Sequence, residues 1–166
     1  MRAILTAFAL LLFAGCGFQL RGAYALPYES LYLALPDYSD LGAGLKRAIR
    51  ASGSTRLAET VEDAQARFVP SADARERVIL SLSGTGRVRE LRLRWRYSYR
   101  IVDAKGVDMV PVNEIELVRD LTYDDSNVLA KEQEEVLLWR DMQGDMVQQI
   151  MRRLAAVKPA PPAVVE

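Results

Sequence analysis

The chain has 166 residues, enough for one domain once an N-terminal segment is removed. Its 22 basic and 22 acidic side chains leave no net charge, so no long-range field attracts it to nucleic acid and we expect no nucleic-acid partner. The absence of histidine and the single cysteine exclude Ser-His-Asp and Cys-His catalysis, an intramolecular disulfide and a Cys-rich zinc site. The composition favours a non-enzymatic protein that needs no metal and no cofactor.

Residues 1–16 are typical of a secretory signal that ends at a cysteine. After Arg2, an apolar run from Ala3 to Phe13 leads to Ala14-Gly15-Cys16. The run is too short to span a hydrocarbon core, which needs about 20 apolar residues, and flanking glycines argue against an N-terminal core helix. Phe13-Ala14-Gly15-Cys16 is similar to a bacterial lipobox, so we predict removal of residues 1–15 and acylation of Cys16. Gly17, in place of aspartate, favours the outer membrane.

The first part of the mature chain predicts one strand and one helix. Residues 16–28 read as a lipidated tether that becomes ordered where it meets a domain at 29–157. An apolar run over 31–35 predicts a strand ended by proline. Asp37 or Ser39 can cap a helix that Gly53 ends, with an apolar face at helical spacing. Its members are Leu41, Leu45, Ala48 and Ile49. In residues 54–76, a short strand near 55–57 and a helical turn around 61–67 are both compatible with the sequence.

The clearest pattern is the alternation of polar and apolar residues along two later strands, which follow a strand over 78–83. Period two from 90 to 101, and again within 107–123, predicts half-buried strands. The predicted inner face holds Leu91, Leu93, Trp95, Tyr97, Tyr99, Ile101, Ile115, Leu117, Leu121 and Tyr123. The predicted outer face holds Glu90, Arg92, Arg94, Arg96, Ser98, Arg100, Glu114, Glu116 and Asp120.

A three-residue loop at 104–106, with Gly106 left-handed, predicts the register of this hairpin. In that register Arg94 lies opposite Glu116 and Arg96 opposite Glu114, while Leu93 meets Leu117 and Trp95 meets Ile115. Proline at 111 cannot donate to a ladder and must lie at an edge or a bulge.

A long final helix is expected over 127–157, capped by residues 124–126. Its apolar stripe comprises Val136, Trp139, Met142, Met146, Val147, Ile150 and Leu154. The Pro/Ala-rich tail at 158–166 is expected to be disordered. The order of elements predicts an α+β fold: a two-layer sandwich in which one mostly antiparallel mixed sheet of about four strands packs on two helices.

Two segments resemble the LptE family of lipopolysaccharide-assembly lipoproteins. Cys16-Gly17-Phe18-Gln19-Leu20-Arg21-Gly22 resembles the start of the mature family members. Residues 119–124 followed by 128–132 resemble the family's last strand and helix start, and the order of elements agrees over most of 16–157. The resemblance implies a lipoprotein anchored on the periplasmic side of the outer membrane. It also implies that the domain plugs and helps assemble the LptD β-barrel and binds lipopolysaccharide during export.

The resemblance also directs attention to three cations. Lys131 stands where the family has a lysine implicated in lipopolysaccharide binding, but a surface lysine paired with Glu135 at i+4 is an equally good interpretation. Arg87 and Arg89 have fewer facing acids than the other arginines, so they are anion-site candidates, with a plain loop as the alternative. The arginines of the 90–101 strand are better explained as a solvated face neutralised by the facing acids, and its aromatic residues as core.

Two other functions remain compatible with the sequence. One is a lipid-anchored structural adaptor of another outer-membrane envelope complex, which co-purification with a large barrel would separate from the first. The other is a carboxylate-dependent periplasmic hydrolase, which requires a concave pocket that holds paired acids, and no spacing in the chain predicts such a pocket.

Overall fold

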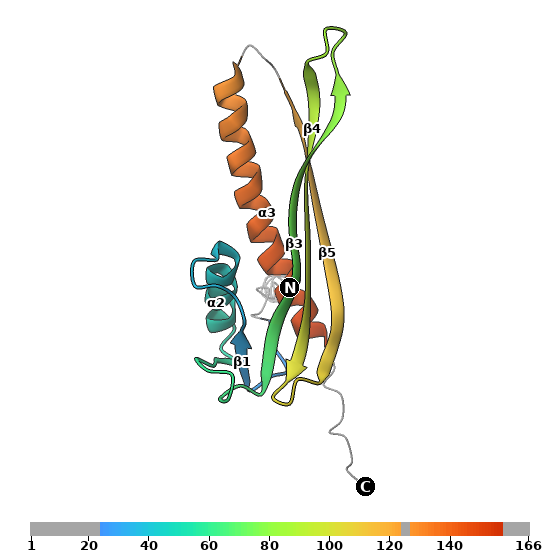
Figure 1. Cartoon of the computed structure of the whole chain (residues 1–166). Coiled ribbons are helices and arrows are strands. Elements are labelled where there is room, and N and C mark those ends of the chain that lie inside the picture. Colours follow the sequence, from blue (N-terminus) through green and yellow to red (C-terminus); the bar gives the residue numbers. More distant parts are fainter. Residues whose placement is uncertain (1–23, 124–126, 158–166) are drawn as a thin grey trace, which may run out of the picture.

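In a computed structural model, residues 24–123 and 127–157 are described. They form one five-stranded mixed sheet in the order β2-β1-β3-β4-β5, with both helices on the same side of it (Figure 1). The elements are β1 (Ser30–Leu33), α2 (Asp40–Ser52), β2 (Arg56–Leu57), β3 (Ala66–Leu82), β4 (Val88–Asp103), β5 (Asp108–Thr122) and α3 (Val128–Ala156). The predicted α+β two-layer fold is confirmed, with five strands in place of about four because β2 adds a short edge strand.

Helix α2 begins and ends where the local sequence indicates. The Ser39 hydroxyl accepts a hydrogen bond from the Gly42 N–H at 3.1 Å, which satisfies one of the amides that a helix start leaves unpaired. Gly53 follows the helix with φ +67°, the left-handed conformation that glycine adopts without a steric penalty. Leu41, Leu45 and Ile49 are buried, as the helical spacing predicts.

Strand β3 is much longer than the sequence suggests. The short strand near 55–57 is present as β2, but the helical segment around 61–67 forms only one turn, in which the Ala64 N–H donates to Val61. From Ala66 onward the chain is strand for 17 residues, paired antiparallel with β4. Pro70 is accommodated because the ladder has an irregularity between Pro70 and Ala72.

The core lies between the inner face of the sheet and the two helices. Trp95, Tyr97 and Tyr99 are buried, as expected, and Phe68 of β3 stacks on Tyr99 with ring centroids 4.8 Å apart. Tyr28, from the segment expected to become ordered as it meets the domain, is also buried there. Burial raises the pKa of the Tyr28 hydroxyl to about 12.

The predicted register of the β4–β5 hairpin holds only beside the turn. Gly106 has φ +86° and Val102 pairs with Asp108, as expected. Two irregularities between Tyr99 and Val102 then shift the ladder by two residues, so the four predicted pairs are wrong. The observed pairs include Arg96–Glu116, Ser98–Glu114, Trp95–Leu117 and Tyr97–Ile115. The residue of β5 that cannot donate a hydrogen bond, Pro111, lies in this stretch. A shift of two preserves which face each side chain occupies.

Helix α3 is 29 residues long, and only its C-terminal part is covered. Residues from Met142 to Leu154 contribute its buried side chains, and Arg119 of β5 bonds to Asp145. Val136, expected in the core stripe, is 60% exposed, because α2 reaches only the lower part of α3 (Figure 1). The predicted cap residues 124–126 lie outside the described residues. No helix in the described part of the chain is long and apolar enough to cross a membrane.

Candidate functional site

The end of the molecule at the β3–β4 hairpin carries two of the three predicted cations. Arg87 stands just before β4, where its amide donates to the Ser83 hydroxyl at 3.0 Å and its carbonyl accepts from the Ser83 amide. Arg89 is exposed in the first residues of β4, and its carbonyl accepts from the Tyr123 amide at 2.8 Å, which ties the end of β5 to this hairpin. The backbone therefore fixes where both arginines leave the sheet.

Lys131, the third predicted cation, lies in the first turns of α3 at the same end of the molecule (Figure 1). Its Nζ atom lies 2.8 Å from Glu134 Oε2, an i,i+3 pair, and only 20% of its side chain is exposed. The predicted i+4 partner Glu135 is wrong, because Glu135 bonds to Arg77 across the layer at 3.0 Å and accepts from the Trp139 indole. Lys131 is thus more enclosed than a surface lysine of an isolated helix.

Arg77 of β3 links these cations and was not anticipated from the sequence. It lines a groove of about 570 Å³ that Arg87 also lines, and its partner Glu135 lies one helical turn after Lys131. The structure therefore places Arg87 and Lys131 around one end of the sandwich, where Arg89 also lies but does not line the groove. The period-two series Arg75, Arg77, Ile79 was the available signal, but the strand predicted from the sequence began only at 78, after the ambiguous segment 54–76.

The outer face of the sheet is uncovered by helices and carries a network of paired charges (Figure 1). Arg96 bonds to Glu76 at 2.5 Å, Arg94 lies 3.7 Å from Glu116 and 3.9 Å from Glu76, and two further pairs lie toward the two ends of β4. These are Arg92–Asp120 at 2.7 Å and Arg100–Asp108 at 3.3 Å. The predicted neutralised face is therefore present, with Glu76 of β3 as an acid that the two-strand hairpin did not include.

Hydrogen bonding in this network shifts the titration of the paired groups. The bidentate bonds from Arg92 hold the pKa of the Asp120 carboxyl below its ordinary value. The bond that Arg96 donates to Glu76 likewise raises the pKa of Arg96. The face therefore presents ion pairs rather than a row of uncompensated arginines that would bind phosphate.

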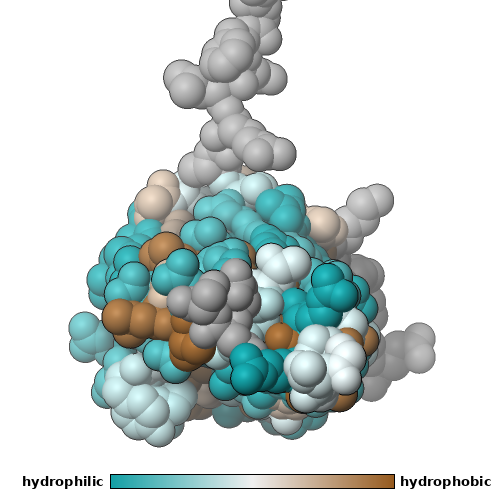
Figure 2. Space-filling model, turned by 90° about the horizontal axis from the view of Figure 1, so that it is seen from above, coloured by the Kyte–Doolittle hydropathy of each residue, from teal (hydrophilic) through white to brown (hydrophobic). Residues whose placement is uncertain are grey.

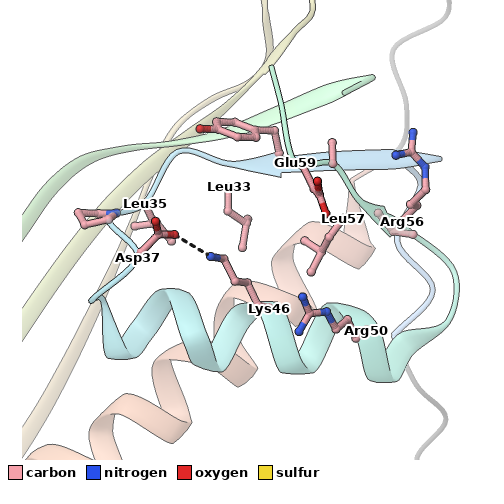
Figure 3. A pocket seen from close by; sticks show the side chains of 12 residues that line it. Leu33, Leu35, Asp37, Lys46, Arg50, Arg56, Leu57 and Glu59 are labelled. Carbon is pink, nitrogen blue, oxygen red and sulfur yellow. Dashed lines mark hydrogen bonds and ion pairs between the residues drawn. The ribbon is translucent and has the colours of Figure 1, made fainter. Parts of the chain in front are cut away.

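A hollow of about 800 Å³ lies between α2 and the β1–β2 edge of the sheet (Figure 3). Leucines from β1 and β2 line it, and Lys46 and Arg50 extend into it from α2. Asp37 and Glu59 enter from different sides, and Asp37, 99% exposed, is bonded to Lys46 at 3.3 Å. This arrangement is not the pair of facing carboxylates that general acid–base hydrolysis requires.

A strip of apolar side chains is exposed on the N-terminal half of α3. Leu129 is 70% exposed and Val136 60%, whereas Val147 is buried against α2. Val136 and Leu129 precede Val147 by 11 and 18 residues, which are close to whole numbers of helical turns, so all three share one side of the helix. On this side of α3, Val147 is therefore covered by α2, whereas Leu129 and Val136 are exposed above it. Seen from the hairpin end, brown apolar patches interrupt a hydrophilic surface (Figure 2).

These features define a small binding domain: one sheet, two helices on one side of it, a charge-paired outer face, and cations gathered at one end. The LptE family, described as lipopolysaccharide-assembly, matches residues 28–154, and the chain belongs to this family. Members of the family are non-enzymatic lipoproteins, so the hydrolase alternative is excluded.

Relatives and solved structures agree with this assignment. The LPS-assembly lipoprotein LptE of Yersinia pestis (strain Pestoides F) is 30% identical over 163 residues, which covers 95% of this chain and 76% of that protein. The solution structure of lipoprotein B from Nitrosomonas europaea is 39% identical, with a TM-score of 0.72, over 84% of this chain and 91% of that one. A minor lipoprotein from Acinetobacter baumannii is 27% identical, with a TM-score of 0.67, over 82% and 99%.

Proposed function

We propose that this protein is an outer-membrane lipoprotein, acylated on Cys16, that plugs and helps assemble an LptD-like β-barrel and binds lipopolysaccharide during its export. Family membership supports a role in lipopolysaccharide assembly in the envelope. Cys16 lies outside the described residues, so the anchor rests on the sequence. The observation that carries the barrel partner is the uncovered outer face of the sheet, on which arginines and acids are already paired.

This face suits the lumen of a β-barrel. The interior of such a barrel is polar, so a plug needs a hydrogen-bonding exterior. Paired charges meet that need at low cost, because burying an uncompensated charge is expensive whereas a bonded pair keeps its partner. The exposed apolar strip on α3, formed by Leu129 and Val136, is proposed as a second contact, since apolar side chains exposed on one side of a helix are available to a partner.

The experiment for the partner is a mild-detergent pull-down of the full, acylated protein from outer membranes. We expect one large barrel to co-purify. Leu129→Asp with Val136→Asp should reduce its recovery, whereas Val107→Asp should not, because Val107 is 62% exposed in the turn at the opposite end of the sandwich (Figure 1). Recovery of a different envelope complex would favour the adaptor function instead. Recovery of the barrel that is insensitive to both changes would remove the strip from the interface.

We propose Lys131, Arg87 and Arg89, on elements that reach the hairpin end, as the lipopolysaccharide-binding residues. A phosphate there would exchange for the Glu134 carboxylate on Lys131, and arginine makes bidentate phosphate contacts. We expect Lys131→Glu with Arg87→Glu to lower lipopolysaccharide retention. The matched control is Lys105→Glu with Arg47→Glu, in the opposite turn and at an exposed position of α2. Equal retention by both double variants would take Lys131 and Arg87 out of the site.

A further inference from the structure

The groove at the hairpin end lies on the core-facing side of the sheet, and apolar side chains form part of its wall. Ile79, Val88 and Leu91 line it together with Tyr123, and Arg77 and Arg87 also belong to its wall. Ile79 is 55% exposed there and Val88 is half-buried, whereas Leu91, which also lines the groove, is buried like Leu93. Ile79 and Val88 are thus the core-type side chains that reach solvent at this end.

The reason is that the sheet continues past the part that α3 covers. Trp139 lies over Arg75, and the Arg77–Glu135 bond at 3.0 Å is the last ion pair between α3 and β3 among the described residues. Beyond it, the residues that line the groove come from the β3–β4 hairpin and from the end of β5, with none from α3. In the part of the chain that the structure describes, a helix layer that stops short leaves this part of the sheet without a helical cover.

Among the described residues, the two charged ones that line the groove are both arginines. Arg77 is 58% exposed, and one of its NH₂ groups bonds to Glu135. A guanidinium has five N–H donors, so this bond leaves others for a second acceptor. The volume of about 570 Å³ lies in the range of small-molecule sites, roughly 300–1,000 Å³, in which apolar walls and a few polar groups fix the ligand.

We propose that this groove holds one acyl chain of an anionic lipid, with the chain on Ile79, Val88 and Leu91 and the anionic head group at the arginines. The inference rests on the proposed function, in that the lipid is then lipopolysaccharide. It adds that the domain recognises the lipid portion through apolar burial and does not only grip phosphates. Charge complementarity selects the acidic head group, and the uncovered core face selects the chain.

The test uses the full chain and a long-chain fatty acid that carries a photoreactive diazirine near its methyl end. After irradiation, we expect mass spectrometry to find the label in the segments around 77–79 and 88–91. Ile79→Asp should lower labelling at least several-fold, because a carboxylate opposes both the apolar chain and the anionic head group. The control is Val112→Asp, since Val112 is a strand residue exposed to 61% that does not line the groove.

A fatty alcohol with the same diazirine separates the two parts of the proposal. We expect it to label more weakly than the acid. Equal labelling by acid and alcohol, labelling spread over other segments, or labelling that Ile79→Asp does not change would overturn the proposal. Circular dichroism checks the fold of each variant, and Ile79→Ser replaces Ile79→Asp if the aspartate does not fold.

The same preparations keep this inference apart from the proposed function. If lipopolysaccharide retention falls in Lys131→Glu with Arg87→Glu but not in Ile79→Asp, the acyl groove is wrong and the phosphate contacts stand. If fatty-acid labelling depends on Ile79 but no lipopolysaccharide is retained by the unaltered protein, the groove stands and the proposed ligand is wrong.

Discussion

Two glycines inside helices should respond in opposite ways to the same substitution. Gly44 lies within α2 where it crosses α3, and a Cβ atom placed there would be 2.9 Å from Val147 Cγ2. Gly144 lies within α3, and a Cβ atom there meets nothing within 4 Å. Both positions are helical, so alanine gains the same backbone preference at each, and the difference isolates the close approach of the two helices.

The magnitudes follow from these distances. Alanine is better than glycine in a helix interior by about 1 kcal/mol, so Gly144→Ala should stabilise the fold by about that amount. Carbon atoms prefer separations of about 3.5–4.0 Å, and overpacking a well-packed interface costs about 1–3 kcal/mol. Gly44→Ala should therefore range from neutral to destabilising by about 2 kcal/mol.

Urea unfolding followed by circular dichroism measures both free energies of unfolding, with the slope checked for constancy. The second step places Gly44→Ala in a Val147→Ala background, where the clashing methyl is gone and the gain of about 1 kcal/mol should return. If Gly44→Ala stabilises the unaltered protein as much as Gly144→Ala does, the helices do not meet as closely as described, and the reasoning is refuted.

Three further outcomes are expected. Asp73→Ala should cost about 1–3 kcal/mol in urea unfolding, because the buried Trp95 indole N–H loses its acceptor at 2.7 Å. Folding raises the pKa of Tyr28 from 10.0 to about 12, so its contribution to stability is present below pH 10.0 and lost as pH rises toward 12; Tyr28→Phe should lose less stability over that window. In Arg92→Ala, carbon-13 NMR should show the carboxyl pKa of Asp120 rise toward its ordinary value, because the hydrogen bonds that depress it are gone.

Where a structural choice was local, the sequence predicted it well. The serine cap and left-handed glycine of α2, the glycine of the β4–β5 turn and the alternation along both strands each involve neighbours in the chain. The inner aromatic residues of β4 and the neutralised outer face follow from that alternation alone. Period-two patterning therefore gave the layer to which each side chain belongs.

Choices that depend on distant partners were predicted less well. The hairpin register changes because β5 has two extra residues near Pro111 relative to β4. The local sequence does not distinguish a proline at a sheet edge from a proline at a bulge. Segment 66–77 has little strand character of its own, and β4 recruits it by pairing along its whole length. The acid that bonds Arg96, Glu76, could not be named while its strand was unassigned.

The candidate site falls in the second group for the same physical reason. Helical periodicity places Val136 on the same side of α3 as Val147. Burial on that side depends on how far α2 extends, and α2 covers Val147 but does not reach Val136. Lys131 and Arg87 come to the same end through pairing between distant segments. Arg77 of β3 lines one groove with Arg87 and bonds to Glu135, one helical turn after Lys131. Local pattern and tertiary cover thus disagree at the hairpin end and on the exposed strip of α3. Apolar side chains that follow the pattern of their element but lack a cover within the described fold are available for a contact outside it, and the proposed lipid and barrel contacts lie at such side chains.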